Sequence, residues 1–144
     1  MKVSDIMTVD VEVTAPDDTV RTAAQLMADT GAGVLPVCDG ERLVGMVTDR
    51  DIAVRAVAQG KSPEQCAVRD VMTPDVNYAM AEDDIENVAR KMGEWQVHRL
   101  PVLNREKRLV GIVSVGDIVL ESGDKKVTAG AMQGIVQPTG KHEQ

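Results

Sequence analysis

Two short segments of the sequence carry a hydroxyl and a carboxylate at the same spacing. Residues 45–52 read GMVTDRDI and residues 111–118 read GIVSVGDI, so Thr48 precedes Asp51, and Ser114 precedes Asp117, by three positions. Such a pair can cap the first turn of a helix by accepting hydrogen bonds from backbone N–H groups. It can also hold a ligand, because the hydroxyl donates to an oxygen and the ionised carboxylate accepts from two neighbouring hydroxyls.

We favour the ligand interpretation for the two aspartates, because the hydroxyl recurs with them, and we leave both interpretations open for Thr48 and Ser114. An anionic ligand would also need donors or cations. Arg99 has a planar fork of donors, His98 a ring N–H, and Arg50 a further guanidinium. Taken singly, each arginine is equally compatible with a solvated surface charge, and His98 with an exposed or core histidine.

The two segments belong to a repeat that covers most of the chain. VSDIMT at 3–8 returns as VRDVMT at 68–73, and LPV at 35–37 returns at 100–102, both 65 positions later. A fixed offset indicates two copies of one structural unit. We therefore assign residues 1–60 to repeat 1, 61–67 to a linker, 68–122 to repeat 2 and 123–144 to a partly loose C-terminal extension.

Each copy predicts the same order of elements. A short extended segment leads to an acidic cluster that caps a helix, two adjacent strands form a hairpin, and a second helix follows, over 49–58 in the first copy. The first helix of each copy has an apolar stripe at helical spacing. The stripe residues are Val20, Ala23, Ala24 and Met27 in one copy, and Ile85, Val88, Ala89 and Met92 in the other. The predicted fold class is α+β, with a small, mostly antiparallel sheet and two main helices per repeat, and the repeats packed sheet to sheet.

The composition disfavours several classes of partner. The chain is 43% hydrophobic and 27% charged, as in globular proteins, and its net charge of −7 disfavours nucleic acid. Because no apolar run suits a signal peptide or a membrane span, we expect a cytoplasmic protein with no membrane partner. Cys38 and Cys66 lack the spacing of metal ligands, so we expect no metal site and two free thiols, one in the core and one in a loop.

At these residues the chain resembles a tandem CBS-domain pair, also called a Bateman module. The matching features are DIMT and DVMT, LPV, RLVG and the G-h-x-[ST]-x-x-D phrase, each present twice within roughly residues 1–122. The resemblance implies that an adenosine-containing ligand binds in composite clefts between the two copies. AMP is the first candidate, ATP, NAD(H) and S-adenosylmethionine are alternatives, and no cofactor is required.

The resemblance also implies a regulatory role as a homodimer that acts on a separate, unknown protein target. A ligand-free interaction module is the alternative. We predict no enzymatic activity, because the sequence contains no GxSxG, Walker or GxGxxG motif and its acids recur where family members contact ribose.

Carried over residue by residue, the resemblance assigns ligand contacts to two clefts. The first cleft would contain Thr48, Arg50, Asp51, Thr73, Val76, Tyr78, Val97, His98 and Arg99. The second would contain Thr8, Val13, Gly33, Val34, Ile112, Ser114 and Asp117. Because Gly33 and Val34 align with His98 and Arg99, we expect the phosphate in the first cleft and weaker binding in the second.

The adenine would lie against aliphatic side chains in this picture. Val76, Val97 and Met46 are the candidates, with Tyr78 nearby, although an ordinary core position competes for Val76 and Met46. For Trp95 we favour helix-end packing or a dimer interface over stacking on a base.

Overall fold

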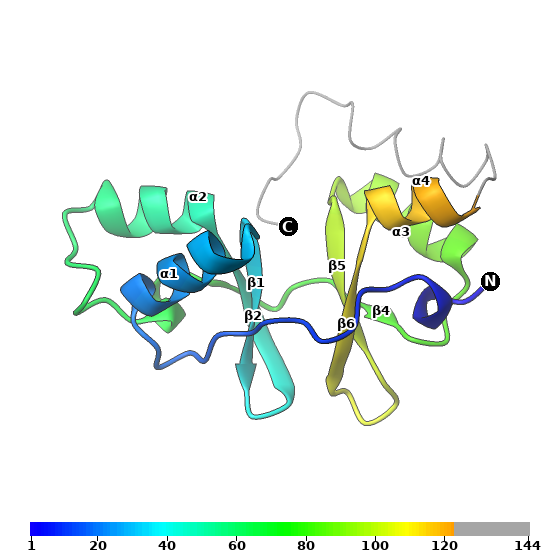
Figure 1. Ribbon diagram of the computed structural model, residues 1–144, viewed down its shortest axis with the longest axis horizontal. Coiled ribbons are helices and arrows are strands. Elements are labelled where there is room, and N and C mark those ends of the chain that lie inside the picture. The colour runs from blue at the N-terminus through cyan, green and yellow to red at the C-terminus, as the bar shows by residue number, and fades with distance from the viewer. Residues whose placement is uncertain (123–144) are drawn as a thin grey trace. The chain divides into compact units, whose positions relative to one another are not determined.

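The computed structural model describes residues 1–122, which form two compact units (Figure 1). Unit 1 comprises Met1–Val11 and the described residues from Asn77 onward, and unit 2 comprises Glu12–Val76. The first eleven residues therefore belong to the same compact unit as the second half of the chain. The predicted C-terminal extension, 123–144, lies outside the described residues.

Unit 2 contains one three-stranded antiparallel sheet with helices beside it. Its elements are α1 (Val20–Thr30), β1 (Val34–Asp39), β2 (Arg42–Thr48), α2 (Asp49–Ile52), the π-helical turn η2 (Ala53–Val57), the 3-10 turn η3 (Val68–Asp70) and β3 (Thr73–Pro74). The strand order is β1-β2-β3. The hairpin predicted between the first two strands is present, and Gly40 in its turn has a φ of +63°, which glycine adopts at little cost.

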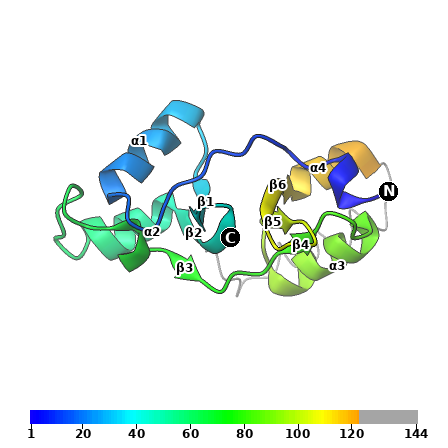
Figure 2. The ribbon, with the colours of Figure 1, turned by 90° about the horizontal axis from the view of Figure 1, so that it is seen from below.

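Unit 1 repeats this plan with one parallel strand pair. Figure 2 shows its strands together with α3 and α4. Its elements are η1 (Val3–Asp5), β4 (Ala79–Met80), α3 (Ile85–Trp95), β5 (Arg99–Leu103), β6 (Leu109–Ser114) and α4 (Val115–Ser122). The order is β4-β5-β6, with β4 parallel to β5 and β6 antiparallel to it. Both units thus have the predicted α+β architecture.

Each unit has its own apolar core between one sheet face and its helices. In unit 2, β1 and β2 contribute Leu35, Val37 and Val47, which are at most 1% exposed. In unit 1, Leu100, Val102 and Val113 of β5 and β6 are fully buried. Alternate residues of these strands point to the opposite face of the sheet, which carries those candidate ligand residues that belong to β1, β2, β5 and β6.

Several local predictions about the helices are wrong. Ala24 is exposed, because the buried stripe of α1 runs through the other three predicted residues, whereas all four predicted residues of α3 are buried. The capping prediction holds for α1, where Thr19 of the DDT cluster accepts from the Thr22 N–H, and fails for α3, where Asp84 of the EDD cluster makes no side-chain cap bond. The predicted helix over 49–58 is α2 followed by a π-helical turn.

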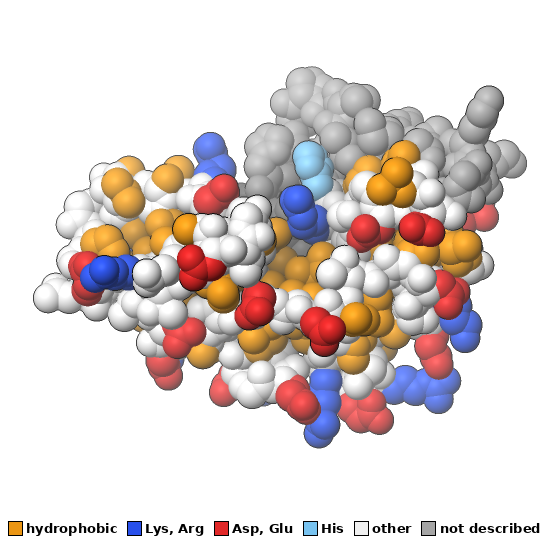
Figure 3. All heavy atoms as spheres, viewed as in Figure 1, with side chains coloured by type: hydrophobic (Ala, Val, Ile, Leu, Met, Phe, Trp, Pro, Cys, Tyr) orange, Lys and Arg blue, Asp and Glu red, His pale blue; other side chains and the backbone are white. Residues whose placement is uncertain are grey.

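Both cysteines are free and buried, Cys38 in β1 and Cys66 in the core cluster of unit 2. The prediction of a loop cysteine therefore understates the burial of Cys66. Trp95, the last residue of α3, packs at the edge of the unit 1 core, as helix-end packing predicts. Charged side chains are dispersed over the face shown in Figure 3. Among the described residues, no helix is long and apolar enough to cross a membrane.

Candidate functional site

The two hydroxyl–carboxylate pairs have the same construction in the two units. In unit 2, the Thr48 N–H donates to Asp51 Oδ2 at 2.9 Å, and the Asp51 N–H donates to Thr48 Oγ1 at 3.0 Å. In unit 1, the Ser114 N–H donates to Asp117 Oδ2 at 2.9 Å, and the Asp117 N–H donates to Ser114 Oγ at 3.1 Å. These are reciprocal capping boxes. The capping interpretation is therefore confirmed for both pairs, and a hydroxyl that accepts one hydrogen bond can still donate its own hydrogen.

The two pairs differ in burial and in their charged neighbours. Asp51 is 4% exposed, whereas Asp117 is only half-buried. The Arg55 guanidinium lies near the buried carboxylate, with Nη1 at 3.9 Å from Asp51 Oδ1. A buried carboxylate needs such compensation, because removing an unpaired charge from water is costly.

The sheet face of unit 2 that points away from the core carries four of the candidate residues. Val34 pairs with Thr48 across β1 and β2, and Thr73 pairs with Met46 across β2 and β3. Met46 and Thr48 are two positions apart on one strand, so their side chains lie on the same face, opposite the core residue Val47. The sheet therefore places Thr48 and Thr73 close together, as the first predicted cleft requires.

Unit 1 shows the corresponding arrangement. Arg99 pairs with Ser114 across β5 and β6, and Thr8 forms a bridge with Ile112. This bridge corresponds to the Thr73–Met46 pair of unit 2. Each of the two MT segments, VSDIMT at 3–8 and VRDVMT at 68–73, therefore joins the sheet of the other copy. The sheet brings Thr8, Ile112 and Ser114 together, as the second predicted cleft requires. It also places Arg99, which the sequence assigns to the first cleft, beside Ser114 of the second.

Thr73 carries an unsatisfied hydroxyl. Its Oγ1 atom is buried and has no hydrogen-bond partner, the one such side-chain atom among residues 1–122. Buried polar groups are nearly always hydrogen-bonded, so an orphaned hydroxyl calls for a specific explanation. Its position on the same sheet face as Thr48 makes a ligand contact one such explanation.

The remaining candidates are divided between the two units. Unit 2 also contains Val13, Gly33, Arg50 and Val76, and unit 1 also contains Tyr78, Val97 and His98. Arg50, His98 and Arg99 are exposed, whereas Val97 is buried. The grouping of residues from both units into one cleft remains a prediction.

Tyr78 already has a neighbour within unit 1. The Lys107 ammonium donates to the Tyr78 hydroxyl at 3.2 Å and lies 5.6 Å from the centre of the ring. The second hairpin is one residue longer than the first, and the insertion lies beside Lys107. The hydroxyl of Tyr78 is thus directed at the hairpin turn, and a contact with adenine would use the ring.

Gly33 shows why the two copies differ chemically before the LPV strand. The Asp49 N–H donates to the Gly33 carbonyl at 3.0 Å, and a Cβ atom on Gly33 would lie 2.9 Å from Asp49 Oδ2. In unit 1, the equivalent bond runs from the Val115 N–H to the His98 carbonyl at 2.9 Å. Unit 2 therefore has an acid where unit 1 has an apolar residue, and glycine where unit 1 has histidine.

Sequence reasoning missed the contact residue Arg55 and the role of Gly45. Arg55 lies four residues after Asp51, a helical spacing that the sequence could have revealed. Gly45 lies where the β3 backbone approaches β2 closely. The signal in the sequence is the VG dipeptide, which occurs at this position in both copies.

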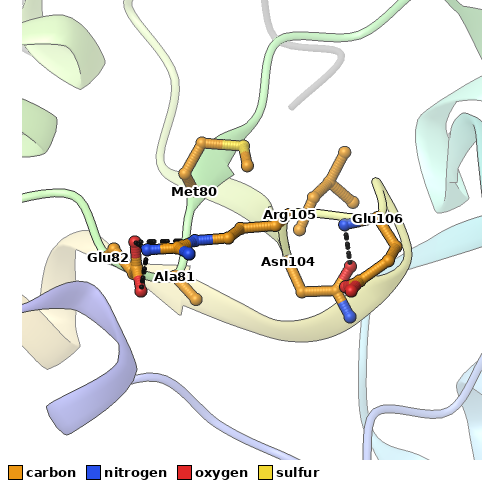
Figure 4. A pocket seen from close by; sticks show the side chains of 7 residues that line it. Met80, Ala81, Glu82, Asn104, Arg105 and Glu106 are labelled. Atoms are coloured by element: carbon orange, nitrogen blue, oxygen red, sulfur yellow. Dashed lines mark hydrogen bonds and ion pairs between the residues drawn. The ribbon is translucent and has the colours of Figure 1, made fainter.

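A pocket of about 360 Å³ lies in unit 1 beside the β5–β6 hairpin (Figure 4). Arg105 and Glu82 form a two-pronged ion pair at its edge, with N–O distances of 2.9 to 3.2 Å. The hydrogen bonds from Arg105 lower the pKa of the Glu82 carboxyl. The remaining lining residues are Met80, Ala81, Leu103, Asn104 and Glu106. None of them is a predicted ligand residue.

Comparison with known proteins identifies the family. The model of the CBS domain matches residues 3–57 and 68–124. The chain belongs to the CBS domain family. It is 35% identical to the CBS domain-containing protein YhcV of Bacillus subtilis over 133 residues, which are 92% of this chain and 94% of that protein. The resemblance found in the sequence is therefore confirmed.

Solved structures of CBS proteins share the fold. The crystal structure of Hypoxic Response Protein I with two coordinated zinc ions has a TM-score of 0.77 and 36% identity, and the match covers 84% of this chain and 98% of that one. Hypoxic response protein 1 of Mycobacterium tuberculosis is 39% identical over 115 residues, which are 79% of this chain and 80% of that protein. CBSX2 in complex with AMP has a TM-score of 0.74 and 29% identity, and the match covers 84% of this chain and 95% of that one. CBSX2 comes from Arabidopsis thaliana.

Proposed function

We propose that this CBS-pair protein is a regulatory module that binds an adenosine nucleotide and signals to a separate protein partner without catalysing a reaction. AMP is the first candidate, with ATP and NAD(H) as alternatives. The observation that carries the proposal is the buried, unpartnered hydroxyl of Thr73 on the same sheet face as Thr48. The complex of the related CBSX2 with AMP supports the choice of ligand.

The aspartates supply the ribose contact in this proposal. Each uses Oδ2 to accept the N–H of its capping partner, and a carboxylate has about four lone-pair sites, so it can accept further hydrogen bonds from ribose hydroxyls. The capping box holds the carboxylate in place before any ligand arrives. The Thr73 hydroxyl would donate to a ribose or phosphate oxygen.

The phosphate contact falls to His98 and Arg99. Both side chains are exposed and both can donate hydrogen bonds to an anion. The aligned positions of unit 2 are Gly33 and Val34, with the Asp49 carboxylate against Gly33. We therefore expect the two ligand positions to differ in their preference for phosphate.

A ligand-free interaction module is the second candidate. It is favoured by the capping boxes, which satisfy the Thr48 N–H and the Asp51 N–H without any ligand. A fold can persist while its sites lose their ligands, so family membership alone does not choose between the two candidates.

Calorimetry with AMP, ATP, NADH and GTP separates the candidates. We expect binding of an adenosine nucleotide and no binding of GTP. A nucleotide concentration a hundred times the Kd should raise the free energy of unfolding by about 2.7 kcal/mol.

Asp51→Asn keeps an acceptor for the Thr48 N–H but removes the charge, and should weaken binding roughly ten- to a hundredfold. Asp29→Asn, on the exposed side of α1, is the matched control. Absence of nucleotide binding by the unaltered protein would favour the ligand-free module.

Comparison of AMP with adenosine tests the phosphate contact. His98→Ala and Arg99→Ala should weaken AMP binding but leave adenosine binding nearly unchanged, whereas Asp51→Asn should weaken both. Native mass spectrometry of the purified protein would show whether it is a homodimer, as we propose, and whether a nucleotide co-purifies with it.

A further inference from the structure

One guanidinium of unit 2 connects the buried carboxylate to the segment that carries Thr73. Arg55 Nη1 donates to the carbonyl oxygens of Val71 at 3.1 Å and Met72 at 3.2 Å. The same nitrogen lies 3.9 Å from Asp51 Oδ1. Arg55 lies outside the capping box and contacts both the Asp51 carboxylate and the backbone just before Thr73.

The local helix geometry sets the direction of this side chain. Arg55 lies in η2, where the hydrogen bonds change to the i→i+5 pattern and the Ala58 N–H donates to the Ala53 carbonyl at 2.9 Å. A π-helical turn alters the angular spacing of side chains and is frequent at functional sites. The turn begins two residues after Asp51, so it acts on Arg55 and leaves the capping box unchanged.

The second copy has a glutamate in place of this arginine. Glu121 follows Asp117 by four positions, as Arg55 follows Asp51. A glutamate has no donor for the backbone carbonyls, and its charge has the same sign as that of the aspartate. Glu121 therefore cannot make in unit 1 the contacts that Arg55 makes in unit 2.

We infer that Arg55 is a positioning residue for nucleotide binding by unit 2. It holds the Val71–Thr73 segment and the Asp51 carboxylate in one arrangement, so that Thr73 and Asp51 meet the ligand together. Arg55 itself does not contact the nucleotide. This inference depends on the proposed nucleotide binding, and it adds a coupling between the ligand and the segment preceding β3.

The test compares Arg55→Met with Arg21→Met. Methionine keeps much of the apolar stem and removes the guanidinium, and Arg21 is an exposed arginine of the same unit with a surface ion pair to Glu64. AMP affinity is measured by calorimetry, and amide hydrogen exchange is followed in peptides covering 68–74. We expect Arg55→Met to bind AMP on the order of tenfold more weakly and to exchange faster in this segment, while Arg21→Met matches the unaltered protein.

Each outcome leads to a different conclusion. A purely structural role would lower the melting temperature of Arg55→Met but leave the Kd unchanged, which would overturn the inference. If the unaltered protein binds no adenosine nucleotide, the proposed function fails first. If Arg55→Met does not fold, Arg55→Lys takes its place, because lysine keeps the charge beside Asp51 but has a single ammonium in place of the guanidinium. Weaker AMP binding by Arg55→Lys with faster exchange at 68–74 would support the inference. Unchanged AMP affinity would overturn the inference.

Discussion

The carbonyl oxygen of Thr73 lies 2.7 Å from the point that a Cβ atom on Gly45 would occupy. Unit 1 repeats the relationship, with the Thr8 carbonyl oxygen 2.8 Å from the Cβ position of Gly111. Real Cβ contacts are essentially never so short. Glycine in the middle of β2 and of β6 therefore allows each MT segment to pair with its sheet, and this pairing brings the threonines to the candidate sites.

We predict that Gly45→Ala and Gly111→Ala each lower the free energy of unfolding by about 1–3 kcal/mol, because the added methyl group must displace backbone. Urea unfolding followed by circular dichroism measures the change. Gly116→Ala is the control: its nearest contact is Ser114 Oγ at 3.6 Å, so alanine in the first turn of α4 should be neutral or stabilising. A Gly45→Ala protein with unaltered stability would contradict the close approach.

The ends of α1 and α3 provide a second pair of aligned positions. Gly31 follows α1 with a φ of +72°, and Gln96 follows α3 with a φ of +58°. A left-handed conformation costs a non-glycine residue roughly 1 kcal/mol. We predict that Gln96→Gly stabilises the protein and that Gly31→Gln destabilises it, each by about that amount, in thermal unfolding. Equal stabilities of the Gly31→Gln variant and the unaltered protein would show that this cost is absent.

Repetition explains why so much of the fold could be predicted from the sequence. The LPV and RLVG segments recur in register, and the structure contains the hairpin and the first helix that the repeat predicts in each copy. The π-helical turn at Ala53–Val57 could not be predicted, because no residue pattern distinguishes it from an α-helix. Several neighbouring polar residues could accept the hydrogen bond from the Thr22 N–H at the start of α1. The sequence does not determine that Thr19 is the one that does.

The candidate site was predictable in its hydroxyl–carboxylate pairs and not in their surroundings. Thr48 and Asp51 were identified because they recur as Ser114 and Asp117. The contact from Arg55 to the Val71 carbonyl joins segments 16 residues apart, and nothing in the sequence specifies which carbonyl an arginine will reach. Long-range contacts of side chains with backbone depend on tertiary structure.

The capping role of Thr48 can be separated from its role in binding. Thr48→Ala removes the acceptor of the Asp51 N–H and should lower the free energy of unfolding, without nucleotide, by about 0.5–2 kcal/mol. Thr48→Ser keeps the hydroxyl and should restore most of that stability. Chemical unfolding of the three proteins measures the difference. A Thr48→Ala protein as stable as Thr48→Ser would mean that the cap contributes little.

Because of the Cys38 thiol, the free energy of unfolding should depend on pH in the alkaline range. Burial raises the pKa of this thiol from 9.0 to about 11. Between these two pKa values the unfolded chain has lost the thiol proton and the folded chain keeps it. The contribution of Cys38 to the free energy of unfolding is therefore fully present below pH 9 and falls as the pH rises from 9 to about 11. Other groups also titrate there, so Cys38→Ala is measured in parallel by urea unfolding. We expect the unaltered protein to lose more stability than Cys38→Ala on passing from pH 8 to pH 10.5, because the variant lacks the titrating thiol, and parallel pH profiles would contradict the shifted pKa.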